Sequence, residues 1–61
     1  MKTLTAWIEN NPSTGEIKPW EVWLLVEDFA ARRIASCKTE AAARKSMASS
    51  LKRNAPYFKI I

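Results

Sequence analysis

The sequence predicts a small α+β fold, in which one helix packs on one face of a small antiparallel sheet of three or four strands. Three observations support this prediction. The start of the chain alternates between apolar and polar residues, and a run rich in Val, Trp and Leu follows it. An alanine-rich segment then carries signals for both ends of a helix. The expected order is strand, strand, strand, helix, strand (β-β-β-α-β), in a single domain of residues 1–61.

The chain has 61 residues, which is close to the lower limit for a domain held together by a hydrophobic core alone. Its composition is 48% hydrophobic and includes three tryptophans, as expected for a globular protein. The single cysteine, Cys37, can form no internal disulfide, which favours a reducing cytoplasm. We interpret it as a small buried apolar residue. No apolar run approaches the roughly 20 residues that span a membrane, so we expect a soluble protein.

The first strand is predicted at residues 3–9, where apolar and polar side chains alternate. Trp7 falls on the polar side of this strand, where it either covers a sheet edge or is available to a partner. The cluster at residues 10–16 predicts a hairpin loop, because Pro12 restricts the backbone and Gly15 can adopt a positive φ.

Residues 20–29 permit two interpretations. As a strand, they place Val22, Leu24 and Val26 on one face. As a helix, their apolar residues follow a spacing of three and four, with Pro19 in the first turn. The crowding of Val, Trp and Leu favours the strand, although no Asn-Gly or Asp-Gly pair of a tight hairpin follows it.

A third strand is expected at residues 32–38, running antiparallel to the second. Either Ile34 or the set of Arg33, Ala35 and Cys37 would face the helix, because side chains alternate along a strand. The small residues at the end of this segment would let the helix approach the sheet closely.

A helix is predicted at residues 41–53, with Thr39 as its N-cap. Asn54 is suited to end the helix, and Pro56 prevents its continuation. Residues 57–61 have high β propensity and predict a short last strand at a sheet edge. The apolar stripe expected on the helix is Ala43, Met47, Ala48 and Leu51.

The net charge of +4 is distributed unevenly. Residues 1–31 carry two lysines against five carboxylates, a net charge of −3. Residues 32–61 carry eight basic residues against Glu40 alone, a net charge of +7. Such an asymmetry indicates either an acidic partner, of which nucleic acid is the commonest, or a basic surface that only solubilises the helix. The candidate phosphate-binding residues are Arg32, Arg33, Lys38, Arg44, Lys45, Lys52 and Arg53.

Three expected strands, followed by a Lys-Thr-Glu-Ala-Ala junction at residues 38–42 and a helix, resemble the arm-type DNA-binding domains of phage tyrosine recombinases. The resemblance covers residues 20–51. It implies a sheet that enters the DNA major groove, a helix that packs behind this sheet, and DNA contacts by Arg32 and Arg33. This chain departs from the family in lacking a glycine between the second and third strands and in adding a last strand. The small size would also suit a phage or mobile-element accessory protein.

We expect no enzyme, because the chain has no histidine and its helical serines have no partner base. No metal site, cofactor or small-molecule substrate is indicated. We expect a protein-interaction or accessory module that uses a sheet edge or an aromatic patch and binds another protein or itself, as a homodimer. Its expected interaction surface is Trp7, Trp23 and Tyr57. The alternative is a basic nucleic-acid-binding domain, in which Trp7 or Trp23 stacks on a base.

Overall fold

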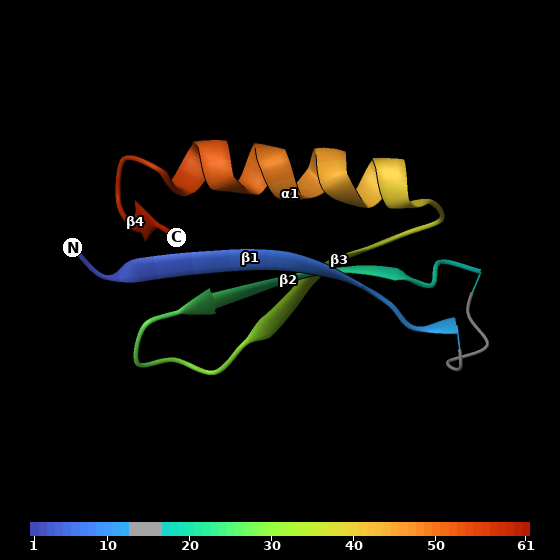
Figure 1. Cartoon of the computed structure of the whole chain (residues 1–61), viewed down its shortest axis with the longest axis horizontal. Helices are drawn as coiled ribbons and strands as arrows, with labels where there is room; N and C mark the ends of the chain where they lie inside the picture. The colour runs from blue at the N-terminus through green and yellow to red at the C-terminus, as the bar shows by residue number, and fades with distance from the viewer. Residues whose placement is uncertain (13–16) are drawn as a thin grey trace.

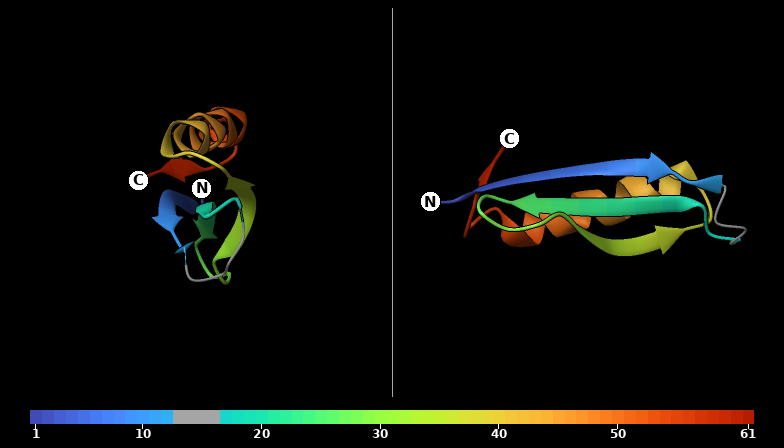
Figure 2. Two further views of the ribbon diagram at one scale, coloured as in Figure 1. Left: turned by 90° about the vertical axis from the view of Figure 1, so that its right-hand side faces the viewer. Right: turned by 90° about the horizontal axis from the view of Figure 1, so that it is seen from below.

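The computed structural model of the chain describes residues 1–12 and 17–61 and has the expected α+β fold (Figure 1). In these residues one sheet of four strands, in the order β3-β2-β1-β4, carries one helix along one face (Figures 1 and 2). The predicted loop at residues 10–16 includes Gly15, which lies outside the described residues. The elements are β1 (Thr3–Asn10), β2 (Trp20–Val26), β3 (Arg32–Cys37), α1 (Glu40–Asn54) and β4 (Lys59–Ile60).

The strand interpretation of residues 20–26 is confirmed. β1 and β2 pair antiparallel in one continuous register, from Leu4 opposite Val26 to Asn10 opposite Trp20. Because every second side chain points to the same side, this register puts one apolar set on the face that α1 covers, namely Leu4, Ala6, Ile8, Val22, Leu24 and Val26. Leu4 and Val22 are fully buried there.

The turn between β2 and β3 needs no Asn-Gly pair, because Asp28 itself adopts a positive φ of 72°. The amide of Phe29 donates to the carbonyl of Val26 at 2.9 Å, which closes a four-residue turn with Asp28 in its third position. Aspartate tolerates this left-handed conformation better than most residues other than glycine. The local sequence therefore forms a tight turn within the five-residue connection of residues 27–31, and the usual dipeptide signals do not reveal it.

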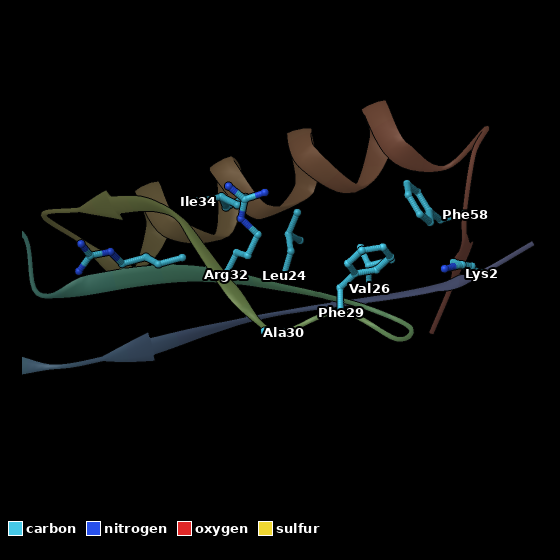
Figure 3. A pocket seen from close by; sticks show the side chains of 9 residues that line it. Lys2, Leu24, Val26, Phe29, Ala30, Arg32, Ile34 and Phe58 are labelled. Carbon is cyan, nitrogen blue, oxygen red and sulfur yellow. The ribbon is translucent and has the colours of Figure 1, made fainter.

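A register shift in β3 resolves the open question of which side chains face the helix. Val22 pairs with Ala35 and Trp23 pairs with Arg33, so Ile34 is an extra residue in the third strand, at a β-bulge. Arg33 shares the face of Trp23, whereas Ile34 lies with the helix-side residues (Figure 3). Ile34 therefore lies on the helix side, as one alternative expected, and Ala35 and Cys37 of the other alternative lie there as well, whereas Arg33 does not, because the bulge interrupts the alternation.

Helix α1 begins as predicted. The Thr39 side chain accepts a hydrogen bond of 3.1 Å from the amide of Ala42, and the acidic residue of the first turn complements the helix dipole. Its inner face differs from the expected stripe, because Ala48 is exposed and Ser50 is buried instead. Ala43 is fully buried, so small residues make the closest approach between helix and sheet.

The last strand is shorter than expected and changes the type of sheet. β4 pairs in parallel with the beginning of β1, so the sheet is mixed rather than wholly antiparallel. The amide of Lys59 donates to the carbonyl of Lys2, and that of Ile61 donates to the carbonyl of Leu4. The direction follows from topology, since α1 carries the chain back over the sheet, so that β4 runs in the same direction as β1.

Candidate interaction site on the open face of the sheet

One face of the sheet packs against α1, and in the part of the chain that the structure describes no element covers the other (Figure 2). The strand registers place residues of three adjacent strands on this uncovered side. We call it the tryptophan face. It includes Thr5, Trp7, Glu9, Glu21, Trp23, Leu25, Arg33 and Ser36.

Two tryptophans form the centre of this face. Trp7 and Trp23 are direct cross-strand partners in the β1–β2 ladder. Their ring centroids are 6.4 Å apart and their planes differ by 9°, so the indoles stack. Cross-strand aromatic pairs of this kind stabilise a sheet by roughly 0.5–1 kcal/mol. The pair thus supports the hairpin locally, while both side chains remain only partly buried.

Each indole N–H is hydrogen-bonded within the face. Trp7 Nε1 donates to Glu9 Oε2 at 3.2 Å, and Trp23 Nε1 donates to Glu21 Oε1 at 3.3 Å. Both carboxylates lie two residues from their tryptophan, a spacing that places the two side chains on the same face of a strand. The polar atoms of the indoles are therefore satisfied internally, and their apolar surfaces are the part that remains for a contact.

Glu21 is the most constrained polar side chain of the face, with only 6% of its surface exposed. Its second oxygen, Oε2, accepts from Nη1 of Arg33 at 2.9 Å. A carboxylate buried to this degree needs both charge compensation and hydrogen bonds, and it receives them from one arginine and one indole. Arg33 is thus held as a structural partner of Glu21.

The structure brings together two of the three residues expected to form an interaction surface. Trp7 and Trp23 are in contact at the centre of the tryptophan face. Tyr57 is exposed in the turn between α1 and β4 and does not belong to this face.

The expected phosphate-binding residues do not form one surface. Arg32 pairs with Leu24 and Arg33 with Trp23, so the two arginines point to opposite faces of the sheet. Arg44 binds Glu40 on the helix, with 2.6 Å between Arg44 Nη2 and Glu40 Oε1. The others are exposed on α1 or just before it, and they are Lys38, Lys45, Lys52 and Arg53.

Sequence reasoning missed the two carboxylates, Glu9 and Glu21. A usable signal was present, because Glu9 follows Trp7 by two residues and Glu21 precedes Trp23 by two. In a strand this spacing places a carboxylate beside an indole N–H. What the sequence lacks is any sign that Arg33 would close over Glu21, since that depends on the bulge.

Among residues 1–12 and 17–61, no three His, Cys, Asp or Glu side chains are grouped closely enough to hold a metal ion. Cys37 is a half-buried free thiol. No helix in this part of the chain has the length and apolar content needed to cross a membrane. Comparisons with protein-family models, curated proteins and solved structures found no match. The resemblance to recombinase arm domains therefore remains a prediction.

Proposed function

We propose that this protein is a non-enzymatic protein-interaction module, which docks through the tryptophan face onto a second copy of the chain. The observation that carries the proposal is the stacked pair of Trp7 and Trp23 on a sheet face that no described element covers. Tryptophan is among the residues most enriched at the energetic centres of interfaces, because it buries a large apolar area at a small cost in side-chain entropy.

The charges of the face support a second copy as the partner. Glu9 lies on β1 and is exposed, whereas Arg33 lies on β3 with 46% of its side chain exposed. Two copies can face each other through the tryptophan face, related by a two-fold axis that runs parallel to the strands and is centred on β2. In this arrangement β3 of each copy lies over β1 of the other. Each Arg33 would then lie close to the partner copy's Trp7 and Glu9, and the face would be self-complementary, as a two-fold interface requires.

The size of the face suits a weak or transient dimer. The Cα atoms extend over 38 × 21 × 13 Å, with the strands along the longest dimension and the helix and sheet stacked along the middle one (Figures 1 and 2). The whole chain therefore projects about 500 Å² (38 × 13 Å) on this side, and the tryptophan face is a part of that area. Two copies together would bury less than about 1,000 Å² through it, in the range of weak or transient interfaces, which is below roughly 1,200 Å².

The small hydrophobic core is a physical reason for association. In the described residues, only Leu4, Val22 and Ala43 are fully buried apolar side chains. A second copy on the tryptophan face would add buried apolar area without lengthening the chain, and mass action would then stabilise the folded state.

The direct test is the molecular mass in solution, by analytical ultracentrifugation from about 10 μM to about 1 mM, a range that brackets weak interfaces. The mass should rise from 6.9 kDa towards twice that value with concentration. Trp7→Ser should abolish the rise, whereas Tyr57→Ser, which alters an aromatic residue outside the face, should leave it intact. A parent chain that stays at 6.9 kDa throughout, or a Trp7→Ser variant that associates normally, contradicts the proposal.

A second candidate function, nucleic-acid binding, is favoured by the outer side of α1. Lys45 and Lys52 lie two turns apart on exposed positions and have no carboxylate partner among the described residues. This candidate predicts an affinity for duplex DNA that falls steeply with added salt. The double variant Lys45→Glu/Lys52→Glu should abolish this binding. No binding at low salt would remove it.

A further inference from the structure

A second concave surface lies on the helix side of the sheet and shares only Arg33, at the β3 edge, with the tryptophan face. It is a groove of about 810 Å³ between the β2–β3 hairpin and the segment that follows α1 (Figure 3). Its volume falls in the range of roughly 300–1,000 Å³ that is typical of ligand sites. The residues that line it are Lys2, Leu24, Val26, Phe29, Ala30, Arg32, Arg33, Ile34 and Phe58.

The groove has two structural causes. The inner side of α1 carries small residues such as Ala43 and Ser50, which leave the outer part of the sheet uncovered. The bulge in β3 then turns Ile34 to the helix side. As a result, Ile34 is 41% exposed and Phe29 is 62% exposed beside the groove, although both are large apolar residues.

The charged groups of the groove are all cationic in the described residues, and no carboxylate lines it. The ammonium of Lys2 lies 4.7 Å above the centre of the Phe29 ring and 3.8 Å from a carboxylate oxygen of Asp28, which belongs to the adjacent turn. Arg32 has no carboxylate partner within residues 1–12 and 17–61. Lys2 and Arg33 are each paired with a carboxylate outside the groove, so Arg32 supplies the uncompensated positive charge at the rim of an otherwise apolar groove. This combination matches an anionic apolar ligand.

The groove borders an open sheet edge. β3 is the outermost strand in the order β3-β2-β1-β4, so the N–H and C=O groups on its outer side face no neighbouring strand in the described sheet. The strand contains no proline, and Arg32 and Arg33 project to its two faces. Basic residues at an edge discourage pairing with another basic strand and leave it open to an acidic one.

We infer that this groove and the outer edge of β3 form a binding site for an extended acidic, apolar peptide, which adds to the sheet as a fifth strand. Every second side chain of such a peptide would point to the helix side. There, apolar side chains would contact Phe29 and Ile34, and a carboxylate between them would meet Arg32, which lies between these two residues along the groove (Figure 3). Main-chain hydrogen bonds would supply affinity, and the groove with its arginine would supply specificity.

The test uses the full chain labelled with ¹⁵N and three blocked peptides of nine residues. The first peptide has Val, Glu and Val at successive alternate positions with Thr between them. The second replaces Glu by Lys, and the third replaces both Val residues by Ser. The first peptide should shift the amide resonances of β3, Phe29 and Phe58. The affinity of the other two peptides should be lower by a factor of about ten or more, because each lacks one of the two complementary features.

Charge reversal provides the matched variants. The Arg32→Glu variant should no longer bind the Glu peptide and should bind the Lys peptide more tightly. Lys45→Glu, a charge reversal on the outer side of α1, should leave the affinities for both peptides unchanged. Trp7→Ser, which removes the proposed dimer contact, should leave peptide binding unchanged. Failure of this site is therefore distinguishable from failure of the proposed function.

Three results would overturn the inference. One is equal binding of the Glu and Lys peptides to the parent chain. Another is a set of amide resonance changes, on addition of the Glu peptide, that is confined to the tryptophan face. The third is saturable binding of dodecanoate in the groove with no binding of the Glu peptide, which would assign the groove to a lipid-like anion instead.

Discussion

Glu21 and Arg33 lie twelve residues apart in the sequence and form an ion pair of 2.9 Å on the face of the sheet opposite the helix. The pair links β2 to β3, and Trp23 contributes a hydrogen bond to the same carboxylate. Glu21 is almost fully buried and Arg33 is about half exposed, so the two partners should respond differently to mutation.

Arg33→Ala should destabilise the fold more than Glu21→Gln does. The first change leaves a buried carboxylate with one indole N–H, whereas Gln buries no charge and can keep one of the two hydrogen bonds through its carbonyl oxygen. We expect a loss of about 1–2 kcal/mol in the free energy of unfolding for Arg33→Ala, since the exposure of the arginine weakens the pair below a fully buried one. Urea denaturation of the two single variants and the double variant measures the coupling. Equal losses in both single variants would contradict this asymmetry.

The indoles of Trp7 and Trp23 should produce an exciton-coupled signal in the circular dichroism spectrum, because their ring centroids are only 6.4 Å apart. Trp7→Phe and Trp23→Phe should each remove the signal. Trp20→Phe is the matched control, since Trp20 lies on the helix side of the same strand. A signal that disappears in Trp20→Phe and persists in the other two would show that the tryptophans are arranged differently.

Asp28→Gly should stabilise the hairpin by about 0.5–1 kcal/mol, because glycine adopts the positive φ of this position without steric cost. The mutation also removes the exposed ion pair between Lys2 and Asp28, which contributes little. Asp28→Ala removes the same ion pair but keeps the Cβ atom, so it should not stabilise the protein. Thermal unfolding of the two variants separates the effects, and equal midpoints would indicate that the backbone conformation costs nothing.

Thr39→Ala should cost about 1 kcal/mol in the free energy of unfolding, because the amide of Ala42 loses its side-chain acceptor. Thr39→Ser keeps an acceptor in the same place and should stay within a few tenths of a kcal/mol of the parent protein. Urea denaturation followed by far-UV circular dichroism measures both values. An Ala variant as stable as the Ser variant would show that the cap does not contribute.

Local patterns were sufficient for most of the fold. The alternation in residues 3–9, the β propensity of residues 20–26 and the Thr39 cap each depend on neighbours close in sequence, so the strands, the helix and their order were predictable. The aromatic part of the candidate site was also predictable, since Trp7 and Trp23 were both expected on the side away from the apolar stripes. Their stacking is a consequence of the β1–β2 register.

The sequence by itself determined an α+β fold whose helix covers one face of the sheet, because residue periodicity is a local property of the chain. Tertiary structure alone decided the bulge at Ile34, the parallel direction of β4, and the burial of Glu21 under Arg33. Each of these depends on which strand lies beside which and in what register. A shift of one residue moves a side chain to the other face, and only the packed sheet selects the register.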